Sequence, residues 1–135
     1  MGEEVFIDTN IFLEIFLDDS KSEECKKFLQ SLEEQDKQAV TTDFTVYSCI
    51  LVIQHNLKNT NFIKNAIIFF NNLHNLKVLR PSFDEFYNAI KIMETNNLDF
   101  DDGLVIACMR NNKIKQLASL DKHFDKVKEI ERIKI

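Results

Sequence analysis

The sequence predicts an α/β protein in which a parallel β-sheet lies between two layers of helices. Short apolar segments alternate along the chain with longer amphipathic segments of helical length. Parallel strands are buried on both faces, so they form apolar runs, and helices cross over the sheet between them. Polar residues follow several of these runs, at the expected carboxyl ends of the strands. The predicted strands are residues 5–7, 38–42, 76–79, 115–120 and 132–135.

The first half of the chain begins with the apolar strand Val5–Ile7, which ends in the polar residues Asp8–Asn10. Ser20 and Glu23 have the spacing of a capping box, which favours a helix start at Ser20. The helix after the second strand is expected to be mostly buried. We expect the segment Ile67–Phe70 to belong to the core rather than to a dimer surface. The predicted helices are residues 11–17, 20–34, 43–57 and 60–73.

The second half of the chain continues the alternation after the third strand. Ser82 and Glu85 have the spacing of another capping box, which predicts a helix through about residue 95. Leu98–Asp102 is predicted as a loop that leads into the helix Gly103–Asn111. A short turn or helix at residues 122–125 then follows the fourth strand.

Composition excludes several classes of protein. Gly103 is the only interior glycine, so the glycine-rich phosphate-binding loops GxGxxG and GxxxxGK[ST] are ruled out. The three cysteines, Cys25, Cys49 and Cys108, are far apart and lack zinc-knuckle spacing, so we expect buried free thiols. With 44% hydrophobic and 29% charged residues, the chain is expected to form a single globular domain over residues 1–135.

Hydropathy and charge bear on location and partners. The sequence has no run of about 18 apolar residues and no N-terminal signal, so we expect a cytoplasmic protein that does not enter a membrane. Its net charge of −5 does not attract nucleic acid over a distance. Attraction to RNA would have to come from bound metal or from local cations, of which Lys122 and Lys126 are the best placed.

Three aspartates lie where strands of a parallel sheet end. Asp8 follows the first strand, Asp121 follows the fourth, and Asp102 opens a helix at the same end of the sheet. Ligands bind at this end of an open α/β sheet, so we expect the three carboxylates to converge. Clustered carboxylates raise one another's pKa, and Mg²⁺ or Mn²⁺ relieves the repulsion and activates water for phosphodiester hydrolysis. Taken singly, each aspartate is also explained as a helix cap or a turn residue.

Three short motifs resemble those of the PIN-domain family in order and spacing. Asp8–Asn10, after an apolar strand, resembles the opening motif of that family. Leu98–Leu104 resembles its central motif, in which an aspartate before a small residue opens a helix. Ser119–Asp125 resembles its last motif, a Ser/Thr-x-Asp followed by a Phe-Asp pair. The resemblance spans nearly the whole chain, and the three motifs together are fairly specific.

This resemblance implies both a fold and an activity. The family has a four- or five-stranded parallel sheet flanked by helices and Mg²⁺- or Mn²⁺-dependent endoribonuclease activity. Many small members are VapC-type toxins that pair with an antitoxin protein and form homodimers. Asp8, Asp102 and Asp121 match the catalytic, metal-binding aspartates, and Asp99 matches a frequent auxiliary metal-binding acid. The residues that match the supporting polar groups are Thr9, Asn10 and Ser119.

One position departs from the family pattern. The usual glutamate lies about six residues past a Thr or Ser at the second strand, and counting from Thr42 that position is Ser48. Asp43 and Glu14 are alternative carboxylates for the site. Loss of one carboxylate is expected to weaken metal binding or change the number of bound ions, so it affects catalysis rather than the fold.

The leading hypothesis is therefore a metal-dependent ribonuclease that acts on RNA, with the toxin of a toxin–antitoxin pair as its special case. The second is a non-catalytic binding or assembly module that keeps the fold but lacks the family glutamate. A phosphotransfer protein fits worse. A receiver domain has an acidic pair after its first strand, and a haloacid-dehalogenase phosphatase needs Asp-x-Asp, where this chain has Asn10 as the second member.

Overall fold

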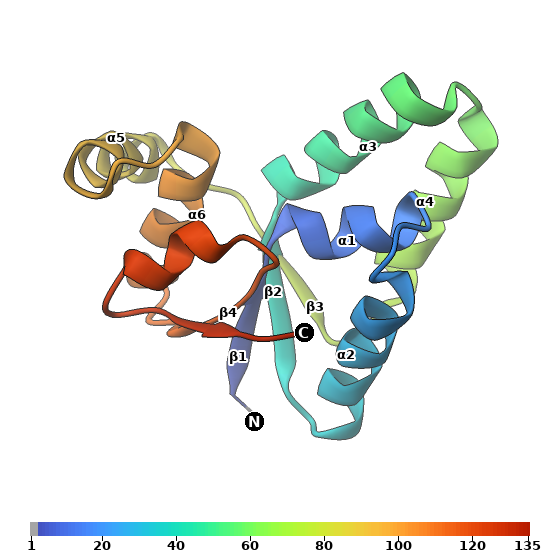
Figure 1. Cartoon of the computed structure of the whole chain (residues 1–135), viewed down its shortest axis with the longest axis horizontal. Helices are drawn as coiled ribbons and strands as arrows, with labels where there is room; N and C mark the ends of the chain where they lie inside the picture. The colour runs from blue at the N-terminus through green and yellow to red at the C-terminus, as the bar shows by residue number, and fades with distance from the viewer. Residues whose placement is uncertain (1–2) are drawn as a thin grey trace.

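The computed structural model describes residues 3–135, which form a five-stranded parallel sheet between two layers of helices (Figure 1). The order of the strands across the sheet is β3-β2-β1-β4-β5. The predicted three-layer α/β/α fold is thus confirmed. The strands are β1 (Glu4–Ile7), β2 (Gln38–Thr42), β3 (Leu76–Leu79), β4 (Gln116–Ala118) and β5 (Glu131–Ile133). The helices are α1 (Thr9–Phe16), α2 (Ser22–Glu34), α3 (Asp43–Leu57), α4 (Thr60–Asn72), α5 (Phe83–Asn96), α6 (Phe100–Asn111) and the short 3₁₀ helix η1 (Lys122–Lys126).

The strand order changes direction between β1 and β4. From β1 the chain extends the sheet through β2 to β3, and it then returns to the other side of β1 to add β4 and β5. The pair Ile7–Ala118 closes the register between β1 and β4. Ligands of open α/β sheets bind beyond the carboxyl ends of the strands at such a switch point. The residues that follow Ile7 and Ala118 therefore lie where a site is expected.

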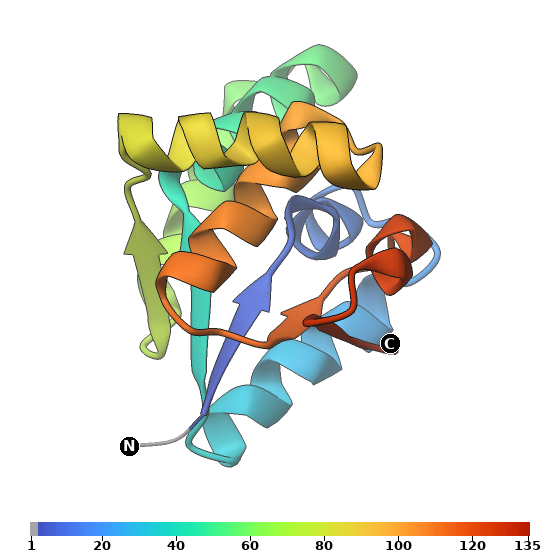
Figure 2. The same ribbon diagram turned by 90° about the vertical axis from the view of Figure 1, so that its left-hand side faces the viewer.

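Side chains of the central strand β1 alternate between the two faces of the sheet. Val5 and Ile7 pack in the core with α1 and α2, whereas Phe6 packs in the core with α5 and α6. Figure 1 shows α1–α4 on one side of the sheet, and Figure 2 shows α5 and α6 lying across the other. All three side chains are fully buried. Helices on both faces explain why the strand is apolar throughout rather than at every second residue.

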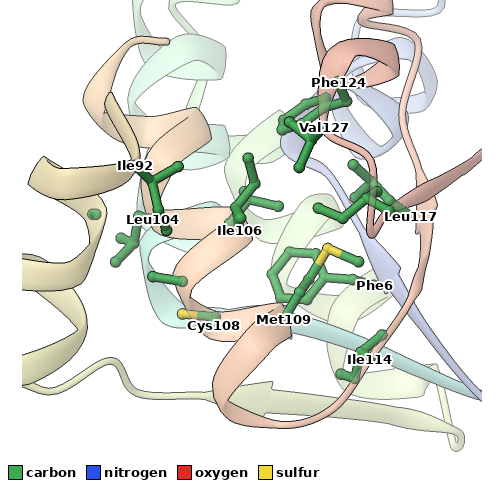
Figure 3. Packing of buried hydrophobic residues seen from close by; sticks show 14 of the residues in the cluster. Phe6, Ile92, Leu104, Ile106, Cys108, Met109, Ile114, Leu117, Phe124 and Val127 are labelled. Atoms are coloured by element: carbon green, nitrogen blue, oxygen red, sulfur yellow. The ribbon is translucent and has the colours of Figure 1, made fainter. Parts of the chain in front are cut away.

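The core on the α5–α6 side also holds η1 in place. Phe124 and Val127 belong to the same cluster of buried residues as Leu117 of β4 and Ile106 of α6 (Figure 3). Phe124 is fully buried, and burying a phenylalanine side chain contributes about 2 kcal/mol to stability. This anchor fixes the backbone that follows β4, which includes Asp121.

Gly103 allows α6 to approach α5 closely. A Cβ atom at this position would lie 2.7 Å from the carbonyl oxygen of Ala89 and 3.2 Å from Cγ of Met93. Displacing a backbone atom at that distance is energetically costly, so any larger residue would push the first turn of α6 away from α5. Asp102 lies directly before this contact, so the close packing of the two helices sets its position.

The start of α2 differs from the sequence prediction. The helix begins at Ser22 after Lys21, which makes no side-chain capping hydrogen bond, so the capping box of Ser20 with Glu23 is wrong. The backbone N–H of Lys21 instead donates to Oε1 of Glu14 at 2.9 Å. A contact from α1 therefore decides where this helix starts.

Two predictions about the second half have opposite outcomes. The capping box of Ser82 with Glu85 is confirmed, with both of its hydrogen bonds present. The predicted helix start at Gly103 is wrong, because α6 begins at Phe100. Asp101 and Asp102 therefore lie in the first helical turn rather than in a loop. Negative charge is favourable at a helix N-terminus, which helps to explain why two acids are tolerated there.

The exposure of two helices also differs from the prediction. α3 is not mostly buried, since Tyr47 and Leu51 are 57% and 63% exposed. The segment Ile67–Phe70 divides between core and surface. Its phenylalanines pack on aromatic rings of α1, whereas Ile67 and Ile68 are about half exposed. Both helices are apolar on more than one face, so the sequence pattern did not distinguish the covered face from the open one.

The three cysteines are buried free thiols, as predicted. Burial raises the pKa of Cys25 to about 11 and that of Cys49 to about 12, and it also raises the pKa of Cys108. Cys25 and Cys49 lie in the core on the α1–α2 side, and Cys108 lies in the core on the α5–α6 side. Within residues 3–135, no helix is both long enough and apolar enough to cross a membrane.

Candidate functional site

Asp8 is held at the carboxyl end of β1 by hydrogen bonds to both of its oxygens. Its side chain is buried and caps α1, with Oδ1 accepting the backbone N–H of Thr9 at 2.8 Å. Oδ2 accepts the Ser119 hydroxyl at 2.7 Å and the Asn10 amide at 3.2 Å. The fold itself therefore fixes the orientation of this carboxylate.

Asn10 and Ser119 connect the ends of β1 and β4 across the switch point. The Asn10 amide also donates to Oγ of Ser119 at 3.2 Å, and its Oδ1 accepts the backbone N–H of Leu120 at 3.1 Å. Oγ of Ser119 accepts the backbone N–H of Asp121 at 3.0 Å. The predicted supporting residues thus form one network, which ties Asp8 to the backbone that carries Asp121.

A second group of ligand atoms lies between α6 and η1. One ligand atom from each of Asp102, Asp121 and His123 lies within 4.8 Å of the others, a spacing that could hold a metal ion. Oδ1 of Asp121 accepts the backbone N–H of His123 at 2.9 Å and lies 3.1 Å from its imidazole Nδ1. Both aspartates are half-buried, whereas His123 is exposed. Oxygen and imidazole nitrogen donors of this kind suit a divalent cation.

Burial and nearby negative charges raise the pKa of Asp8 and that of Asp102. Burial raises the pKa of Asp8 from 3.8 to about 6, although the hydrogen bonds from Ser119 and Thr9 lower it, and the charges of Asp101 and Asp121 raise it further.

Burial likewise raises the pKa of Asp102 from 3.8 to about 7, and the charges of Asp101, Asp8, Asp121 and Asp99 add to this effect. The carboxylates are therefore close enough to repel one another, and a bound cation would favour their ionised forms. The donor set and its uncompensated negative charge fit a divalent cation.

The α3 side of the site carries hydroxyls rather than a carboxylate. The hydroxyls of Thr9 and Thr45 share a hydrogen bond at 3.0 Å, and Thr45 is buried. Cys49, one helical turn later, is also buried, and the charge of Asp8 contributes to its raised pKa. A small pocket lined by Asp8, Thr9, Thr45 and Asp101 lies between these elements.

The remaining predicted residues do not belong to the group of ligand atoms formed by Asp102, Asp121 and His123. Asp43 forms an ion pair with Arg80 at 3.4 Å, and Glu14 accepts the backbone N–H of Lys21. Ser48 is half-buried in α3, and Asp99 is an exposed residue at the start of α6 that acts on Asp102 only through its charge.

Sequence reasoning did not assign Thr45, Cys49 or Asp101 to the site. The helical spacing of the first two was visible, since residues 45 and 49 share one face of the predicted helix 43–57. For Asp101 the false loop over residues 98–102 concealed its place in the first turn of α6.

An open cleft with several cations lies beside the site. Lys122 and Leu120 connect it to the backbone around Asp121, while Arg132 is paired with Asp125 at 2.7 Å. The cleft is lined by Glu14, Ser20, Lys21, Leu120, Lys122, Asp125, Arg132, Lys134 and Ile135. Four cations and two acids give this region a net positive charge, in contrast to the chain as a whole.

Comparison with known proteins identifies a family for this chain. The family model for the PIN domain matches residues 5–130. No curated protein sequence matches the chain at a significant level.

Several solved structures share the fold. VapC20 of Mycobacterium tuberculosis, a toxin that cleaves the sarcin–ricin loop, has a TM-score of 0.74 and 15% identity, covering 90% of this chain and 92% of that one. A toxin–antitoxin complex from Klebsiella pneumoniae has a TM-score of 0.71 and 17% identity, with coverage of 94% and 95%. VapBC2 from Rickettsia felis, bound to a DNA fragment from its promoter, has a TM-score of 0.74 and 12% identity, with coverage of 96% and 97%.

Proposed function

Because this chain belongs to the PIN domain family, we propose that it is a metal-dependent endoribonuclease that hydrolyses RNA phosphodiester bonds. Residues 1–135 act as a single PIN domain. Asp8, Asp102 and Asp121 are the catalytic residues and bind Mg²⁺ or Mn²⁺, with Asp99 as an outer acid. Such an ion lowers the pKa of bound water and stabilises negative charge on a phosphoryl group.

One observation carries this proposal. The carboxylates of Asp8, Asp102 and Asp121 follow β1, open α6 and follow β4 at the switch point of the sheet, and the pKa values of Asp8 and Asp102 are raised toward neutrality. Structural capping accounts for Asp8 and Asp121 taken singly. It does not account for Asp102, which has a raised pKa and is not the cap of α6. A group of repelling acids at a ligand-binding edge is expected when the protein works with a bound cation.

The other polar residues of the site have positioning roles. Ser119 and Asn10 hold Oδ2 of Asp8, so that this carboxylate keeps one orientation whether or not an ion is present. The hydroxyls of Thr9 and Thr45 face the small pocket beside Asp8 and offer hydrogen bonds to phosphate or to water.

The cleft beside η1 is the proposed path of the RNA backbone. Lys21, Lys122 and Lys134 line it together with Leu120, the residue that precedes Asp121 in the chain. Phosphate contacts supply most of the affinity for a nucleic acid, and they act locally when the net charge of the protein is unfavourable. On a chain with net charge −5, this positive region attracts RNA to the acidic site.

Partner proteins form the second part of the proposal. Two of the similar structures are described as complexes of a toxin with its antitoxin or as VapBC, and we propose that this chain is likewise the toxin of such a pair and binds an antitoxin. Phe83, Tyr87 and Ile90 form an exposed apolar stripe on α5, 79%, 69% and 46% exposed. This stripe supports a protein contact, either in a homodimer or with the antitoxin. The buried free thiols fit a reducing cytoplasm.

RNA cleavage by the purified protein tests the enzymatic proposal. With Mn²⁺ present, the native chain should cleave single-stranded RNA, and Asp8→Asn should lower the rate at least 100-fold because it removes a metal-binding charge. Asp36→Asn, on the loop before β2, is the matched control and should retain the native rate. Equal rates for the native chain and Asp8→Asn would overturn the proposal.

A second candidate function is supported by the α3 side of the site. Thr45 and Cys49 occupy the helix face next to Asp8, and neither supplies a carboxylate. A binding or assembly module without catalysis fits this arrangement. Titration calorimetry with Mn²⁺ separates the two, since the module predicts no metal binding and the nuclease predicts binding that Asp102→Asn weakens.

A further inference from the structure

His123 is the one nitrogen donor in the group of ligand atoms formed with Asp102 and Asp121. Its Nδ1 lies 3.1 Å from Oδ1 of Asp121. Two neighbouring ligands of an octahedral Mg²⁺ or Mn²⁺ ion, each about 2.1 Å from the metal, stand about 3 Å apart. The spacing of these two atoms is thus that of adjacent ligands on one ion.

The backbone around His123 is fixed while its side chain stays accessible. Its N–H donates to Asp121 at 2.9 Å, and the next residue, Phe124, is fully buried. The side chain of His123 is 75% exposed, compared with 30% for Asp121. The imidazole therefore serves no packing role, and an ion from solvent can reach it without rearrangement of the core.

The α3 side of the site is poor in metal ligands, so a donor elsewhere in the site can contribute to binding. Thr45 and Cys49 leave that side without a carboxylate, and Asp43 is paired with Arg80 instead. The site therefore lacks a carboxylate on the α3 side, and His123 offers an additional donor atom on the η1 side.

We propose that His123 is a direct nitrogen ligand of the divalent cation held by Asp102 and Asp121. The proposal rests on the metal dependence proposed above and adds a ligand that shifts the site toward Mn²⁺ over Mg²⁺. Imidazole binds transition metals, whereas Mg²⁺ strongly prefers oxygen ligands. His123 would thereby make up part of the coordination that α3 does not supply.

Pulsed electron paramagnetic resonance of Mn²⁺ bound to the full chain tests the assignment directly. The expected result is a ¹⁴N coupling typical of a coordinated imidazole, which His123→Ala removes. His74→Ala changes an exposed histidine in the turn before β3 and is the control that should retain the coupling. The same variants are titrated with Mn²⁺ and Mg²⁺, and His123→Ala should lower the ratio of Mn²⁺ to Mg²⁺ affinity about tenfold.

The outcomes separate this proposal from the one on which it rests. Bound Mn²⁺ without ¹⁴N coupling, or a coupling that persists in His123→Ala, overturns the role of His123 and leaves the metal-dependent nuclease intact. An absence of Mn²⁺ binding to the native chain overturns both. His123→Asn provides a second variant if the alanine form unfolds, and circular dichroism establishes that each variant is folded before it is titrated.

Discussion

The two walls of the acidic site are built on different principles. On the β1–β4 wall, Asp8, Asn10 and Ser119 form a closed network in which each side chain has at least two hydrogen bonds. On the α3 wall, Thr45 and Cys49 offer a hydroxyl and a thiol without a formal charge. Orientation and charge are therefore supplied by different parts of the site. The first wall fixes geometry, and the negative charge is concentrated toward α6 and η1.

Removing charge at α6 should have the largest effect. Asp102→Asn keeps the shape of the side chain but removes one metal-binding charge, so we expect RNA cleavage to fall about 100- to 1,000-fold. The measurement is the initial rate with saturating Mn²⁺. Asp84→Asn, in the first turn of α5, is the control. A rate within threefold of the native one would mean that the charges needed for metal binding do not lie on α6.

Loosening the β1–β4 wall should have the next largest effect. Ser119→Ala removes the hydroxyl that donates to Asp8 and accepts from the N–H of Asp121, so both aspartates lose a fixed neighbour. Groups that orient metal ligands typically contribute 10- to 100-fold to affinity or activity, and we expect a loss in that range. Mn²⁺ titration and cleavage rates report it, with Ser31→Ala of α2 as control. Unchanged affinity would mean that Asp8 does not need this support.

Adding charge to the α3 wall should strengthen metal binding. Thr45→Asp places a carboxylate in the pocket beside Asp8, and we expect Mn²⁺ affinity to rise about tenfold because the missing side of the site gains a charged ligand. Tyr47→Asp carries the same charge on the exposed face of α3 and should leave affinity within twofold. If both variants bind Mn²⁺ with equal affinity, the electrostatic field of the added charge, and not a ligand on α3, determines the affinity.

The smallest effect concerns the stability of the metal-free fold. The native pKa of Asp102, about 7, lies above the ordinary 3.8, so the unfolded chain releases this proton first as pH rises. Stability is then lost between about pH 4 and pH 7, and metal-free Asp102→Asn should be more stable than the native chain at pH 8.

Because Asp102 is partly exposed, we expect a gain of about 1 kcal/mol at most. Urea unfolding in the presence of a chelator at pH 5 and pH 8 measures it. A gain that is larger at pH 5 than at pH 8 would contradict the assigned shift.

Local signals predicted much of this molecule. The apolar strands, the capping box of Ser82 with Glu85 and the polar residues at strand ends were all legible, because each depends on neighbours within a few positions. The start of α2 was not, since it depends on a contact from Glu14 across a turn. Which acids would face one another also depended on packing, above all on the close approach of α6 to α5 at Gly103.

The three buried thiols make the two layers of the protein separately measurable. A buried thiol reacts with an alkylating reagent only when the surrounding structure opens. Cys108 would report opening of the α5–α6 layer, whereas Cys25 and Cys49 would report opening of the opposite layer. The rate of labelling at each cysteine therefore measures how often the structure around it opens. Mn²⁺, RNA or a partner protein would each lower the rate of cysteine labelling in the layer that it stabilises.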